Sequence, residues 1–148
     1  MNKIEKLIPF ALDSAKKFIE TDSVQHSIPK QFKGYISSFG ASIIQAGLLP
    51  TLAFYSDANK AKGDRSMLIP ALIWILDKNK NLKPDESVIT ALDIIVKDEK
   101  KLPDQMNILF NWLLKQNSEM LRKELMDAAI ALKLALRTFK EIDIKKNE

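Results

Sequence analysis

The chain has 148 residues, no cysteine, one histidine and a formal net charge of +4 at pH 7. Residues 1–148 suit one domain, and the absence of cysteine excludes disulfide bonds, thiol catalysis and thiolate metal sites. The longest apolar run, from Met67 to Leu76, has ten residues, whereas a bilayer-spanning helix needs about 20. We therefore expect a cytoplasmic protein with no membrane partner.

The spacing of apolar residues predicts helices along nearly the whole chain, and signals for β-strands are almost absent. Few glycines and prolines and no low-complexity segment favour an all-α fold, a compact bundle of about six to seven helices joined by short loops. Pro9 either kinks the first helix or moves its start to a later residue. The expected helices span, in chain order, residues 2–21, from Pro29 or Lys30 to Gly47, 49–59, 66–78, from Asp85 to near the charged run 98–101, from Pro103 onward, and from Asn117 or Ser118 to about Ile142.

A sharp corner between two helices is predicted around Gly47 and Pro50. Gly47 takes a positive φ at no steric cost, and Pro50 lies where a new helix has unpaired amide groups in any case. The first of these helices should bury one apolar stripe, its small residues should let another backbone approach closely, and further apolar residues should fill the corner. The stripe is Phe32, Ile36, Phe39, Ile43 and Ala46, the small residues are Gly34, Ser37, Ala41 and Ser42, and the filling residues are Leu48, Leu52 and Phe54.

Two helices carry the longest apolar patterns in the sequence. The run MLIPALIWIL is apolar on all sides, which indicates a central helix, and both Trp74 and Trp112 should be buried. In the last helix, apolar residues alternate by four and three from Leu121 to Ile142 without a break. The stripe is wide, so either it is buried in the bundle or a part of it faces another subunit. The residues that widen it are Ala129, Ile130, Leu134 and Leu136.

The corner also resembles a known family. The run Phe39-Gly40-Ala41, followed by Gln45, Gly47-Leu48 and Leu52-Ala53-Phe54, is similar to the small all-helical subunit of the type III-B (Cmr) CRISPR RNA-guided effector complex. The earlier Ile8-Pro9-Phe10-Ala11 and the later basic loop also fit. The similarity is clearest from Ile28 to Leu76, about 50 residues, and is looser in the helical second half.

The resemblance implies a non-catalytic subunit that stacks in the inner filament of the complex and contacts the backbone of guide and target RNA through basic surface. Its implied partners are copies of itself, the large subunit, the backbone subunits, the CRISPR guide RNA and the target RNA. Cleavage would belong to other subunits. The alternative is a stand-alone helical adaptor or oligomerisation module without a nucleic-acid role, whose basic loops only keep it soluble.

Residues suited to catalysis are few. His26 is the only histidine, so a His-based metal site or a Ser-His pair would rest on a single loop residue. Adjacent acids such as Asp85 and Glu86 point away from each other on a helix. Asp57 and Asp64 have no third ligand at a metal-binding spacing. We predict no enzyme activity, no metal and no cofactor.

The positive charge is concentrated in the first part of the chain. Residues 1–83 carry 12 basic and 7 acidic side chains, and residues 84–148 carry 11 and 12. No acidic residue occurs from Ser23 to Ser56, which is typical of a surface that faces phosphate. A compact basic loop follows near residue 60. By the family resemblance, the first candidates for RNA backbone contacts are Lys30, Lys33, Lys60, Lys62 and Arg65.

The lysines of the first helix are weaker candidates. Lys17 lies four residues after Asp13, and Lys16 lies four before Glu20, so each can pair locally. The aromatic residues are expected mainly in the core, which leaves phosphate and sugar, rather than bases, as the contacts. For each basic cluster, ordinary solubilising charge remains the alternative explanation.

Overall fold

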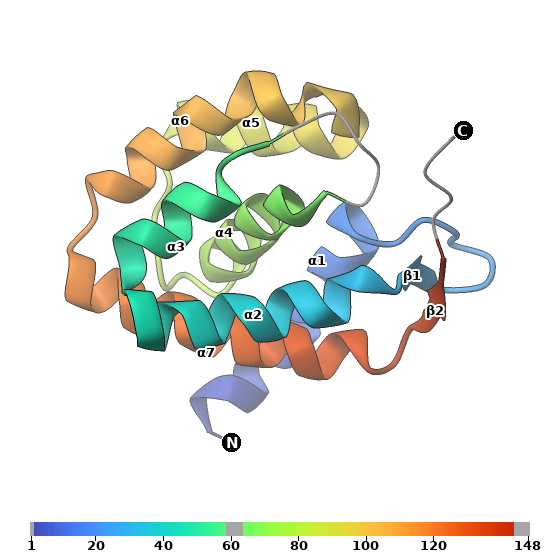
Figure 1. Ribbon diagram of the computed structural model, residues 1–148. Coiled ribbons are helices and arrows are strands. Elements are labelled where there is room, and N and C mark those ends of the chain that lie inside the picture. The colour runs from blue at the N-terminus through green and yellow to red at the C-terminus, as the bar shows by residue number, and fades with distance from the viewer. Residues whose placement is uncertain (1, 59–63, 144–148) are drawn as a thin grey trace.

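The computed structural model describes residues 2–58 and 64–143, and it is a mostly helical bundle (Figure 1). Helices α2 and α7 lie side by side, α4 runs through the centre, and α5 and α6 pack together at the opposite side from α2 and α7. The all-α prediction is thus confirmed. The elements are α1 (Lys3–Phe18), β1 (Ser27–Pro29), α2 (Gln31–Ala46), α3 (Leu48–Tyr55), the 3-10 turn η1 (Arg65–Met67), α4 (Leu68–Lys78), α5 (Glu86–Lys97), the 3-10 turn η2 (Glu99–Lys101), α6 (Leu102–Leu114), α7 (Ser118–Leu136) and β2 (Lys140–Ile142).

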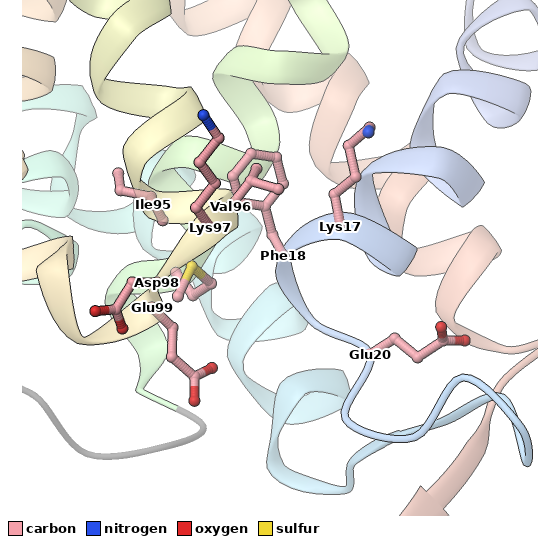
Figure 2. Close-up of a pocket in the computed structure, with 9 residues that line it drawn as sticks. Lys17, Phe18, Glu20, Ile95, Val96, Lys97, Asp98 and Glu99 are labelled. Carbon is pink, nitrogen blue, oxygen red and sulfur yellow. The ribbon is translucent and has the colours of Figure 1, made fainter.

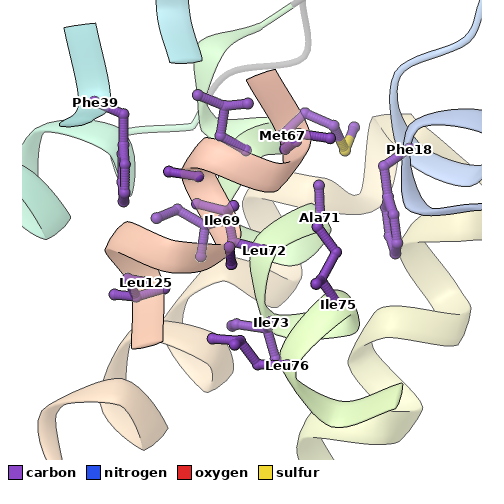
Figure 3. Packing of buried hydrophobic residues seen from close by; sticks show 14 of the residues in the cluster. Phe18, Phe39, Met67, Ile69, Ala71, Leu72, Ile73, Ile75, Leu76 and Leu125 are labelled. Atoms are coloured by element: carbon purple, nitrogen blue, oxygen red, sulfur yellow. The ribbon is translucent and has the colours of Figure 1, made fainter. Parts of the chain in front are cut away.

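Helix α4 is central, as its apolar sequence predicts. It packs against α1 and α7, and from Leu68 to Leu76 every residue except Trp74 is buried. Figure 3 shows Ile69 and Leu72 on the side of α4 toward Phe39, whereas other α4 residues turn away from it. Because this helix has apolar side chains on all sides and few polar ones, it is stable when other helices surround it. The expectation that Trp74 lies in the core is only partly met, because its ring is partly exposed.

The α2–α3 corner forms as predicted. Gly47 ends α2 with a φ of 98°, and the Thr51 hydroxyl donates to the Gly47 carbonyl at 2.8 Å. The Ser42 and Thr51 hydroxyls share a further hydrogen bond of 2.6 Å, which ties the two helices together. These side-chain bonds occupy polar groups that would otherwise be buried without partners. The corner is therefore held by hydrogen bonds as well as by apolar packing.

Three details of the predicted corner are wrong. Ala46 is exposed, although the remainder of its stripe is buried. Phe54 is 55% exposed and does not fill the corner, because the short α3 turns only one side inward. Among the described residues the expected close approach is seen only at Ser42, which is hydrogen-bonded to Thr51 of α3, whereas Gly34 has open space around it and Ser37 and Ala41 are exposed. Most of the small residues of α2 are therefore at the surface rather than in a tight helix–helix contact.

The C-terminal part of the chain corrects the expectation that the last helix reaches Ile142, and it adds a short two-stranded sheet that the sequence barely signals. Helix α7 ends at Leu136, and β2 then pairs in parallel with β1, with Ser27 opposite Lys140. Lys140 N–H donates to the His26 carbonyl at 3.0 Å, and Lys30 N–H donates to Ile142 at 2.8 Å. Backbone pairing with a distant segment thus overrides the helical spacing of the apolar residues.

Helix starts agree with the sequence better than helix ends. The Asn117 side chain accepts from Met120 N–H at 3.0 Å, so Asn117, rather than Ser118, caps α7. Helix α1 continues through Pro9 and ends at Phe18, earlier than expected. It is joined to α4 by the buried Ser14 hydroxyl, which donates to the Ala71 carbonyl at 2.8 Å.

Candidate nucleic-acid interface

Lys30 and Lys33, two of the predicted RNA contacts, lie at the start of α2 beside the C-terminal strand. Lys33 Nζ is 2.9 Å from a Glu141 carboxylate oxygen, and Lys30 Nζ is 3.3 Å from one of Asp143. The window from Ser23 to Ser56 contains no acid, but the fold brings two acids to it from more than 100 residues away. Both pairs are solvent-exposed, so they are weak and exchangeable.

Arg65, the third described candidate, is held against α3. Its guanidinium carbon lies 4.1 Å from the centre of the Phe54 ring, and one terminal nitrogen is 3.5 Å from the Phe54 carbonyl oxygen. Asp57 lies 3.8 Å away, and the Arg65 side chain is 28% exposed. A cation over an aromatic face is attracted by the ring quadrupole. Phe54, which fails to fill the corner, therefore serves to position Arg65. The other two candidates, Lys60 and Lys62, lie outside the described residues.

A polar cleft opens between the C-terminal ends of α1 and α5 (Figure 2). Its volume is about 340 Å³, and Phe18 and Met67 are among the apolar residues that line it. In Figure 2 the amino groups of Lys17 and Lys97 extend to one side, whereas the carboxylates of the cleft lie lower in the view. The cleft therefore has one basic lip and one acidic lip. The carboxylates belong to Glu20, Asp98 and Glu99.

The lysines of α1 are not paired as the sequence suggests. Within the part of the chain that the structure describes, neither Lys17 nor Lys16 forms an ion pair with the acid four residues away. Glu20 instead lies 3.3 Å from the imidazole Nδ1 of His26, on the loop before β1. Lys17 Nζ lies 5.7 Å from the centre of the Trp74 ring, and Lys78 Nζ lies 5.5 Å from it. The spacing rule for helical pairs missed this arrangement, because it considers neighbours on one helix only.

A third kind of lysine environment occurs at the start of α1. Lys3 Nζ lies 3.0 Å from Glu124 and 3.2 Å from Asp127 on α7. The hydrogen bond to Glu124 is the main reason that the pKa of Lys3 is raised above its usual 10.5, against a smaller opposing effect of burial. The second oxygen of Glu124 accepts from the Asn81 amide at 2.8 Å. Glu124 therefore connects α1, α7 and the loop after α4.

The acids considered for catalysis or for a metal site have structural roles. The Asp64 carboxylate accepts from Ser66 N–H at 2.7 Å and from the Ser66 hydroxyl, and so caps η1. Asp85 caps α5, and hydrogen bonds from Ser87 and Val88 lower its pKa. In residues 2–58 and 64–143, no three His, Asp or Glu side chains gather in a way that could hold a metal ion. The same residues include no helix with the length and apolar character needed to cross a bilayer.

These features define a class of protein, a small helical bundle whose polar surface carries lysines and arginine on several elements. The family model of the CRISPR-associated protein Cas_Cmr5 matches residues 5–137. The chain therefore belongs to this family and is a small subunit of the type III-B Cmr complex. Membership implies association with other subunits of that complex. No curated protein and no solved structure matches the chain.

Proposed function

We propose that this chain stacks in the inner filament of a Cmr complex in the cytoplasm and holds the backbone of guide and target RNA, as a single domain without catalytic activity. The observation that carries the proposal is the family match over residues 5–137. The role is architectural and electrostatic, because the basic side chains are exposed on a rigid helical scaffold. Such a scaffold places cations in a fixed pattern, and the phosphate contacts release counterions.

Five residues are proposed to contact RNA. The structure describes three of them, Lys30, Lys33 and Arg65, and the other two are Lys60 and Lys62. The two exposed ion pairs of Lys30 and Lys33 support this role, since phosphate can replace Asp143 and Glu141 as the partner at little cost. Arg65 is oriented in advance by the Phe54 ring, so less side-chain freedom is lost when it binds. The contacts proposed for all five residues are to phosphate and sugar.

Exposed apolar side chains support contact with other protein subunits. Ile44 on α2 is 65% exposed and Leu49 on α3 is 55% exposed, one before and one after Gly47 in the chain. Ile130 on α7 is 40% exposed and lies in the widened apolar stripe that the sequence associates with a subunit contact. The same observations also favour the second candidate, a helical adaptor that binds protein but not RNA.

Reconstitution separates the two candidates. The purified chain is mixed with the other Cmr subunits and guide RNA, and size-exclusion chromatography shows whether it co-elutes and whether target RNA strengthens the association. Replacement of Lys30, Lys33 and Arg65 by glutamine should leave incorporation intact but reduce the salt dependence of RNA binding, with a slope change of about 2 for three lost phosphate contacts on a single strand. If the variant enters the complex and the salt dependence of RNA binding is unchanged, the adaptor function is favoured.

A further inference from the structure

Trp74 is the one partly exposed residue in an otherwise buried stretch of the central helix. Its neighbours Ile73 and Ile75 have 0% exposure, whereas Trp74 packs against the core and keeps part of its surface in solvent. A large aromatic side chain gains most free energy from full burial. The part of Trp74 that remains in solvent is therefore an aromatic surface that a ligand can contact.

Two lysines flank this ring, and they come from different helices. Lys17 Nζ of α1 and Lys78 Nζ of α4 lie 5.7 Å and 5.5 Å from the ring centre. Neither forms an ion pair in the described part of the chain, in contrast to Lys3, Lys30 and Lys33. Each lies over the indole, which holds a lysine only weakly at an exposed site. Both ammonium groups can therefore leave the ring and bind an anion, which attracts them more strongly.

The basic surface continues from Trp74 to the cleft in Figure 2. Lys17 belongs to both places, because it flanks the ring and also lines the cleft. Lys97, on the facing helix α5, extends in the same direction as Lys17. The aromatic ring is thus one part of a row of cations that crosses α4, α1 and α5. The name Trp74 surface is used below for Lys17, Trp74, Lys78 and Lys97.

We propose that the Trp74 surface binds single-stranded RNA, with an unpaired base stacked on the indole and phosphates on the lysines. Cations along a track with an aromatic ring between them are the combination that single strands require, because every base has a π-face and every linkage has a charge. Paired RNA would not offer a base face. An acidic peptide would use the lysines without the ring. This inference rests on the RNA-binding role proposed above and adds a base contact to it.

The test uses the full-length chain and a fluorescently labelled oligouridylate of about ten nucleotides, with binding followed by anisotropy over a range of salt concentrations. Two changes probe different parts of the surface. The double variant Lys17→Gln/Lys78→Gln should lower the salt slope by about 1.4, since two phosphate contacts are lost from a single strand. Trp74→Leu should weaken binding by about fivefold or more and leave the slope unchanged, since only stacking is lost.

Matched controls keep the result specific. Lys6→Gln/Lys123→Gln removes the same charge from two exposed lysines elsewhere and should change binding less than the double variant at the ring. Trp74→Phe keeps an aromatic ring and should restore part of the affinity that Trp74→Leu loses, which also covers the case in which the leucine variant folds poorly. Circular dichroism confirms the helical fold of each variant.

The outcomes distinguish this inference from the proposed function. If neither the lysine changes nor the Trp74 changes lower the RNA affinity, the proposal for the Trp74 surface is overturned and the proposed function stays in place. If the lysine double variant loses RNA affinity but neither Trp74 variant does, base stacking on Trp74 is excluded and the inference is overturned. A wild-type chain that binds no RNA, alone or within the complex, would overturn both proposals.

Discussion

Two lysine surfaces of this protein differ in whether their lysines have carboxylate partners, and the difference is the opposite of what the local sequence suggests. Lys30 and Lys33 come from a window without acids, yet each has a carboxylate partner supplied by the C-terminal segment. Lys17 has an acid four residues away in the sequence, yet within the described residues it has no ion pair and lies beside Trp74.

The difference shows that local charge spacing does not determine surface charge. Tertiary contacts add acids to one surface, whereas the other is left with the cation–π partner that packing happens to offer. A carboxylate four residues away supplies only a few tenths of a kcal/mol, which other neighbours easily outweigh.

The largest effect is expected from the residue that anchors the C-terminal segment. Phe139 is buried between α7 and β2 along the chain, with 6% exposure. Phe139→Ala should lower the free energy of unfolding by about 3 kcal/mol, because a large buried ring is lost and a cavity remains. Urea unfolding measures this change. Phe139→Leu is the control and should lose less than about 1.5 kcal/mol. An alanine variant as stable as wild type would show that the segment with the two acids is not anchored by Phe139.

A smaller effect is expected when the two acids themselves are neutralised. Glu141→Gln/Asp143→Asn leaves Lys30 and Lys33 without their partners, so RNA affinity should rise about threefold, while stability falls by about 1 kcal/mol or less. Anisotropy with the oligouridylate measures the affinity. The control Asp93→Asn/Glu119→Gln makes the same change in net charge on α5 and α7. An equal rise in both variants would mean that only overall charge matters and that the pairing has no role.

The smallest effect is expected at Lys3, the lysine held by two carboxylates. Because its pKa is raised in the folded state, the stability that it contributes is fully present below the unfolded value of 10.5 and is lost as the pH rises through the folded pKa. The difference in thermal stability between wild type and Lys3→Met should therefore be constant near neutral pH and shrink above pH 10.5. Lys6→Met, at an exposed position, should show no such trend. A wild-type advantage that persists at high pH would contradict the pairing.

Much of the helical fold follows from short-range patterns in the sequence. Strict helical spacing buried Phe32, Ile36 and Phe39 on one side of α2, and Gly47 ended that helix because it alone adopts the required positive φ without strain. Asn117 started α7 through a hydrogen bond to a residue three positions later. These features depend on neighbours within a few residues, which the sequence lists directly. The resemblance carried by residues around Gly47 also led to the correct family.

The C-terminal strand and the environments of the lysines depend instead on contacts between distant parts of the chain. Residues 140–142 fit a helical stripe, but β1 offers them a backbone partner from more than 100 residues away. That partner brings Glu141 to Lys33, while the packing of α1 on α4 leaves Trp74 at the surface between Lys17 and Lys78. Such contacts depend on how helices pack and where the chain ends meet, and long-range packing outweighs the weak preferences of neighbouring residues.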